Sequence, residues 1–170
     1  LRATLNDLAT VAPDWLREWV PSDWFDRYSR AIEEYRLPKS IPARQAHAET
    51  VGRDGMQLLS AIYDDGPEWL RQVPSVDVLR QTWVHQYFVD AGKVRLRSAK
   101  DLPPAGERYD SPYDTEARYG NKRSTTWTGY RVHLTETCNK NNIHLITHVE
   151  TTQGHISDTD QTQPIHEALS

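Results

Sequence analysis

The chain has 170 residues, of which 37% are hydrophobic and 26% charged, and its 20 basic against 24 acidic residues give a formal net charge of −4. This length suffices for a sizeable core, and no apolar stretch reaches the roughly 18 to 20 residues of a transmembrane helix. We therefore expect neither a disulfide-stapled miniprotein nor a membrane protein. The sequence starts without Met and shows no signal peptide, and Cys138 has no second cysteine to pair with. We expect a cytoplasmic protein.

The pattern of apolar residues and prolines in the first part of the chain predicts short helices separated by prolines. Apolar residues recur at intervals of three and four from Leu1 to Val11, which places them on one face of a helix. A short amphipathic turn follows at residues 15–20. Ser22 can cap the next helix, whose apolar positions continue to Leu37.

A looser pattern continues this helical region. A helix is expected to begin near Ser40, and Gly52 and Gly55 are expected to divide it. Ser75 can cap a last helix. Five of the six tryptophans precede residue 84 at helical spacing, so we interpret them as core anchors and not as base-stacking platforms. The sequence predicts a helical bundle over residues 1–89.

Residues 90–128 predict a basic, extended connection. The segment opens with a turn at residues 90–92, and residues 93–97 alternate basic and apolar side chains like an edge strand. Five prolines and glycines follow within residues 98–127, which disfavours any regular element there.

Two strand-like runs, Gly129–Thr137 and Ile143–Thr151, follow this connection and are joined by a polar turn at residues 139–142. Alternation predicts one apolar face on each run; the residues are Tyr130, Val132, Leu134, Ile143, Leu145 and Val149. We expect an antiparallel hairpin, and the start of a helix from Asp158. The fold class is α+β, with a helical bundle followed by a hairpin over residues 129–170.

Basic residues concentrate in two windows that contain no acidic residue. These two windows are where the chain could bind phosphate groups. The windows hold Lys93, Arg95, Arg97 and Lys100, and Arg118, Lys122, Arg123 and Arg131. A solvated charged face is the alternative interpretation of such windows.

Histidines near the C-terminal end raise the question of a metal site. Five of the seven histidines lie at or after His133, close to Cys138 and Glu150. In a strand, however, His144 and His148 would stand about 13 Å apart, too far for one ion. We interpret them as exposed strand residues, and a small metalloenzyme using the three histidines is a minor alternative.

Other chemical motifs are weak. The sequence has no glycine-rich phosphate loop, no G-x-S-x-G elbow and no H-E-x-x-H pair. Asp114 and Glu116 lie near the second basic window. They could hold a divalent ion near a phosphate, or pair with Arg118, Lys122 or Arg123 to order the loop, and we favour the second interpretation.

Three long segments, residues 111–123, 127–138 and 144–152, resemble bacterial insertion-sequence transposases of the DDE class, and residues 11–16 and 35–39 resemble the helical region of the same subgroup. The resemblance implies a ribonuclease H-like core in which three carboxylates hold two Mg²⁺ or Mn²⁺ ions. These ions activate water or a DNA 3′-hydroxyl for attack on a phosphodiester.

The resemblance also implies that the catalytic carboxylates lie outside this chain. The family's first Asp precedes the helical region, here residues 1–89 as an insertion between core strands, and its second follows the helix that begins near Asp158. We therefore assign no catalytic or metal residue, and expect a truncated, catalytically incomplete piece. A sheet without its first strand would have a bare edge and an uncovered apolar face, so we expect marginal stability or self-association.

Two functions remain open. The first is a transposase segment that contacts DNA at the element ends through the two basic windows, alone, as a homo-oligomer, or with full-length transposase. The alternative is a non-catalytic helical module that binds protein, with a transposase subunit as one possible partner.

Overall fold

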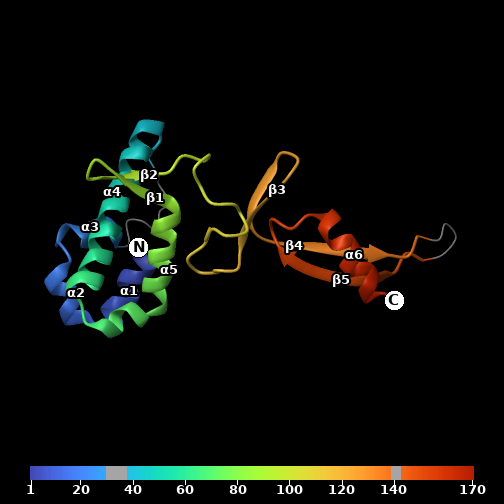
Figure 1. Cartoon of the computed structure of the whole chain (residues 1–170), viewed down its shortest axis with the longest axis horizontal. Coiled ribbons are helices and arrows are strands. Elements are labelled where there is room, and N and C mark those ends of the chain that lie inside the picture. The colour runs from blue at the N-terminus through green and yellow to red at the C-terminus, as the bar shows by residue number, and fades with distance from the viewer. Residues whose placement is uncertain (30–37, 139–142) are drawn as a thin grey trace. The chain divides into compact units, whose positions relative to one another are not determined.

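The computed structural model describes residues 1–29, 38–138 and 143–170 (Figure 1). The chain is α+β, as expected from the sequence. It divides into two compact units, Leu1–Leu102 and Pro103–Ser170, which we call the helical unit and the sheet unit. No helix in the described part of the chain is long and apolar enough to cross a bilayer.

The helical unit is built from seven short helices and one hairpin in its described residues. They are α1 (Arg2–Val11), α2 (Pro13–Trp19), α3 (Asp23–Tyr28), α4 (Ile41–Ser60), the π-helical turn η2 (Ala61–Asp65), the 3₁₀ turn η3 (Glu68–Gln72), α5 (Pro74–Gln86), β1 (Tyr87–Asp90) and β2 (Lys93–Leu96).

A single apolar core holds this unit together. It contains Leu8, Ala12, Trp24, Tyr28, Leu58, Leu59, Ile62, Leu70, Val76, Leu79, Trp83 and Tyr87. Full burial of one such aliphatic side chain stabilises the fold by about 1.5 to 3 kcal/mol. The core positions of α5 match the helical spacing in the sequence. In α1, Leu8 is buried and Leu1 and Leu5 pack against the core, but Val11 is 50% exposed.

Gly52 and Gly55 do not divide α4, which runs unbroken to Ser60. A Cβ atom at Gly55 would lie 2.1 Å from the ring of Trp83, and one at Gly52 would lie 2.4 Å from the ring of Tyr87. The Trp83 indole N–H also donates to the Gly52 carbonyl at 2.8 Å. The glycines therefore allow close packing of two aromatic rings against α4.

Both caps expected from the sequence, Ser22 and Ser75, are wrong, whereas the helix expected to begin near Ser40 does so. Ser40 caps α4 by accepting from the Ala43 amide at 3.3 Å. Ser22 has helical backbone angles, and its hydroxyl caps nothing, because a capping residue needs extended angles. Ser75 lies inside α5, where Pro74 takes the first helical position.

Helix α3 is shorter than expected. It ends at Tyr28, because Ser29 has extended backbone angles. The expected continuation through Ile32 and Tyr35 lies outside the described residues.

The turn expected at residues 90–92 joins β1 to β2. Ala91 and Gly92 have positive φ angles of 45° and 75°, as a two-residue type I′ hairpin requires. Strand β2 pairs only with β1 in the described residues, consistent with the expected edge strand. Strand β1 was not expected, since its residues continue the helical pattern of α5.

The sheet unit contains β3 (Arg118–Lys122), β4 (Thr125–Glu136), β5 (Ile146–Gln153) and α6 (Asp158–Ala168). The antiparallel pairing of β4 with β5 and the start of α6 confirm the expected hairpin and helix. The expectation of no regular element over residues 98–127 is wrong, because β3 pairs with the first half of β4. The polar turn at residues 139–142 lies outside the described residues.

The two faces of the sheet are covered unequally. Figure 1 shows α6 lying along β4 and β5, and its first residue, Asp158, contacts the buried His133 on the face that it covers. The expected apolar face is exposed; Val132, Leu134 and Val149 are 56%, 62% and 56% accessible. Strand β4 pairs with β3 through residues 125–129 and with β5 from Tyr130 onward, so each paired β4 position has one strand partner among the described residues.

Candidate nucleic-acid interface

The two basic windows lie in different units: residues 93–100 belong to the helical unit and residues 118–131 to the sheet unit. In the helical unit, Arg95 is held by Glu49, with both carboxylate oxygens 3.2 Å from Nη1. The Arg97 guanidinium lies 5.7 Å from the centre of the Phe88 ring. Lys93 and Lys100 are exposed, so this window offers two accessible ammonium groups.

Arg118 serves the internal structure of the sheet unit. Its guanidinium donates to the Gly106 carbonyl at 3.0 Å and to the Thr115 carbonyl, and it lies 5.6 Å from the Tyr109 ring centre. These contacts tie the loop before β3 to the first residue of that strand. Arg118 is therefore not a free cation for a ligand.

Arg131 is also engaged. It donates to the Asn121 carbonyl at 3.2 Å and its guanidinium stacks 5.3 Å from the centre of the Trp127 ring. The first contact joins β4 to β3 and the second lies within β4, so the charge of Arg131 is held beside the β3–β4 hairpin.

Lys122 and Arg123 occupy the turn of this hairpin and are exposed. Arg123 has a positive φ of 56°, which the tight connection between β3 and β4 imposes. Lys122 Nζ lies 2.9 Å from Asp158 Oδ2, at the start of α6. The turn therefore presents two cations, of which Lys122 is paired with a carboxylate.

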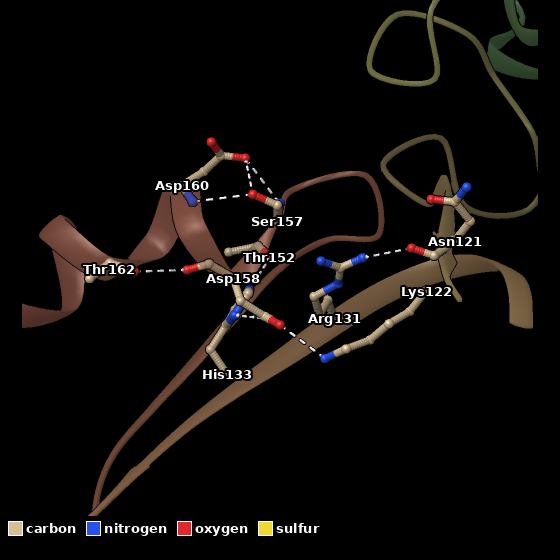
Figure 2. A network of polar contacts seen from close by, with 9 residues as sticks. All are labelled: Asn121, Lys122, Arg131, His133, Thr152, Ser157, Asp158, Asp160 and Thr162. Carbon is tan, nitrogen blue, oxygen red and sulfur yellow. Dashed lines mark hydrogen bonds and ion pairs between the residues drawn. The ribbon is translucent and has the colours of Figure 1, made fainter. Parts of the chain in front are cut away.

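Asp158 is the centre of a polar cluster that also contains Lys122, His133 and Thr152 (Figure 2). Its Oδ1 lies 3.1 Å from His133 Nδ1, and His133 Nε2 lies 2.9 Å from Thr152 Oγ1. A carboxylate only accepts hydrogen bonds, so the arrangement favours the tautomer in which Nδ1–H donates to Asp158 and the Thr152 hydroxyl donates to Nε2.

The position of Asp158 is fixed by the capping box that opens α6. The Asp160 amide donates to Ser157 Oγ at 3.2 Å, and the Ser157 amide donates back to Asp160 Oδ2 at 3.1 Å. The hydrogen bond from Lys122 holds the pKa of Asp158 below its ordinary value, with further contributions from the charges of Lys122, Arg131 and His133. Asp158 is therefore ionised at neutral pH.

A hollow of about 460 Å³ lies between β4 and the face of α6 that follows Asp158. Its polar lining includes Lys122, His133, Asp158, Thr162 and His166. Thr152 does not line this hollow. The chain of contacts from Asp158 through His133 to Thr152 therefore does not present the Thr152 hydroxyl as a nucleophile. Thr152 orients the His133 imidazole instead.

Asp114 orders the loop before β3. Its Oδ1 accepts from the Glu116 and Ala117 amides at 3.0 and 3.1 Å, and the Tyr130 hydroxyl donates to both carboxylate oxygens at 3.0 Å. The ordering role favoured from the sequence is found for Asp114, but its partners are amides and a phenol instead of the expected cations.

The histidines considered for a metal site pair with different acids. His133 contacts Asp158, His144 lies 3.8 Å from Glu136, and His148 lies 3.6 Å from Glu150. Over residues 1–29, 38–138 and 143–170, no group of three or more His, Cys, Asp or Glu is arranged to hold a metal ion.

The Asp158 cluster is not evident from the sequence, because Lys122, His133 and Asp158 are brought together only by strand pairing and the position of α6. The S-x-x-D pattern of residues 157–160 was a usable signal for the cap. No family model, no curated protein and no solved structure matches this chain.

Proposed function

We propose that this chain is a segment of a bacterial insertion-sequence transposase of the DDE class, and that it contacts DNA phosphates. The observation that carries the proposal is the exposure of Lys122 and Arg123 together at the β3–β4 turn, within the motif that resembles the family. On this proposal β4, β5 and α6 belong to a ribonuclease H-like core.

The roles of the basic residues follow from their contacts. Lys122 and Arg123 contact DNA phosphates. Arg118 stabilises the loop before β3, and Arg131 stabilises the β3–β4 hairpin. Lys93 and Lys100 provide a second contact from the helical unit. Contacts of this kind are indifferent to base sequence and weaken with salt.

The proposed chain has no catalytic role of its own. The family's Mg²⁺ or Mn²⁺ ions do not fit the described residues, because these contain no group of three or more acids, histidines or cysteines arranged to hold a metal ion. Asp114, Asp158 and Asp160 accept hydrogen bonds from protein donors. We derive no cleavage step from these residues. The family resemblance places the metal-binding carboxylates outside residues 1–170, and a cytoplasmic location is part of the proposal.

The test is binding to a fluorescent DNA duplex at several salt concentrations. We expect the double variant Lys122→Glu/Arg123→Glu to weaken binding. The slope of log K against log salt should become shallower by the amount that about two phosphate contacts contribute. Lys39→Glu reverses an exposed charge in the helical unit and is the matched control. Equal binding by the parent and the double variant would overturn the proposed contact.

One observation favours the alternative, a protein-binding helical module. A groove of about 480 Å³ between α1, α2 and α3 is lined by Leu5, Leu16, Val20 and Trp24, and by Phe25, which is 76% exposed. On this alternative, Phe25→Asp abolishes co-purification with full-length transposase, and the parent shows no DNA shift at low salt.

A further inference from the structure

Several donors converge on one exposed carboxylate in the sheet unit. Lys122 approaches Asp158 from the end of β3, and His133 approaches it from β4 (Figure 2). Arg131 adds a positive charge nearby, which contributes to the electrostatic field at Asp158. Two elements therefore build an anion-binding arrangement, and a third, α6, supplies the anion.

Two of these groups, His133 and Arg131, are held by contacts other than the one with Asp158. The His133 side chain is 5% exposed and its other ring nitrogen is bonded to Thr152. Arg131 is held by the Asn121 carbonyl and by the Trp127 ring. Removing the carboxylate would leave these groups in place, so another anion could use them.

The carboxylate itself is accessible. The Asp158 and Lys122 side chains are 57% and 60% exposed, so an external anion can reach the pair without unfolding of α6. The hollow of about 460 Å³ beside it has room for a phosphate group and is lined by His133 and Thr162. An exposed ion pair of this kind contributes at most about 1 kcal/mol, so it can be exchanged for a phosphate contact.

We propose that Lys122 and His133 form a binding site for one DNA phosphate, and that Asp158 occupies this site in the free protein as an internal competitor. The inference rests on the proposed DNA binding and adds its regulation. A phosphate displaces the carboxylate from Lys122, and no covalent step is involved. Asp158 therefore lowers the affinity of the β3–β4 turn for DNA.

The first test is the binding of a DNA duplex by four variants beside the parent. At about 50 mM salt we expect Asp158→Asn to bind about tenfold more tightly, with a slope steeper by about 0.9, since one more cation is available to phosphate. Glu167→Gln removes the same charge near the other end of α6, where the carboxylate accepts from Gln163 and does not contact Lys122. It should change affinity less than about twofold.

A double-mutant cycle separates competition from general charge. In a Lys122→Gln background, Asp158→Asn should give no gain, because the competed group is absent. An equal gain from Glu167→Gln, or a gain that persists without Lys122, would overturn the inference.

A second probe, inorganic phosphate, separates this inference from the proposed function. We expect phosphate to shift the His133 imidazole resonances in Asp158→Asn and not in Asp158→Asn/Lys122→Gln. Phosphate shifts without DNA binding by any variant would retain the site and overturn the DNA function. DNA binding without phosphate shifts or gain would retain the function and overturn the site.

Discussion

The helical unit and the sheet unit differ in whether their apolar residues form a buried core. Every residue of the buried core cluster lies between Leu8 and Tyr87, and Ala117 is the single buried hydrophobic residue among those described in the sheet unit. Both units also expose large apolar side chains, among them Phe25 and Ile41 in the helical unit, but among the described residues of the sheet unit no buried core accompanies them. The exposed large apolar residues of the sheet unit are Tyr113, Tyr119, Tyr130, Val132, Leu134, Ile143, Leu145, Ile146, Val149 and Leu169.

The difference has a simple structural origin. Helices α1 to α5 turn their apolar stripes toward one another, so each covers the others. The sheet has two faces, but the described part of its unit contains one helix, α6. The first residue of α6, Asp158, contacts His133 on the face that the helix covers. A sheet that exposes its apolar face needs another surface to cover it. We expect the helical unit to be the more stable of the two.

The largest effect is expected from Trp83→Ala. The Trp83 side chain is buried, bonds to the Gly52 carbonyl and packs 5.2 Å from the Tyr87 ring centre. Its loss should cost about 3 to 5 kcal/mol of unfolding free energy. Trp69→Ala, at a position 46% exposed, should cost less than about 1 kcal/mol. Urea denaturation followed by far-UV circular dichroism measures both, and similar losses would contradict the core assignment.

A smaller effect is expected from Asp54→Asn in the same unit. Asp54 is buried and accepts from Arg27 and, at 2.6 Å, from the Tyr28 hydroxyl. The variant leaves Arg27 with one exposed partner and should cost about 1 to 3 kcal/mol. Asp23→Asn removes that other, exposed partner and should cost less than about 1 kcal/mol. A reversed order in thermal unfolding would contradict the role of Asp54.

In the sheet unit, Leu134→Lys should affect association more than folding. Leu134 is 62% exposed on the apolar face, so a charge there disfavours contact between two such faces. We expect the parent to self-associate and the variant to do so at least about tenfold more weakly in sedimentation velocity. Ile41→Lys, at an exposed position of the helical unit, is the control. A parent that is a sharp monomer at all concentrations would contradict this expectation.

The smallest effect is expected from acid titration of Asp158. Its folded pKa is depressed, so its stabilisation of the α6 start is present above the ordinary carboxyl pKa and is lost as pH falls through the folded value. The protection factors of the amides in the first turn of α6 should fall below about pH 4. The parent and Asp158→Asn should converge there, and a persistent difference would contradict the assignment.

The sequence predicted what depends on local periodicity. The spacing of Val76, Leu79 and Trp83 identified the inner face of α5, and alternation identified the pairing of β4 with β5. It did not predict β3, since Arg118–Lys122 is polar and contains a glycine and is a strand only because β4 is long enough to pair with it.

Tertiary contacts explain the other differences. Gly52 and Gly55 look like helix breakers, and only the approach of Trp83 and Tyr87 shows why a side chain is excluded there. For the candidate site, the sequence identified Lys122 as basic. Its pairing with Asp158, 36 positions away, depends on the connection of β5 to α6, which no local pattern encodes.

The most direct test of the contrast is native-state hydrogen exchange of the whole chain at two protein concentrations. We predict that amides of α4 and α5 exchange only through global unfolding of the helical unit, independently of concentration. Amides of β4 and β5 should have a lower opening free energy that rises with concentration, as the apolar faces cover one another. Equal, concentration-independent protection in both units would contradict the account.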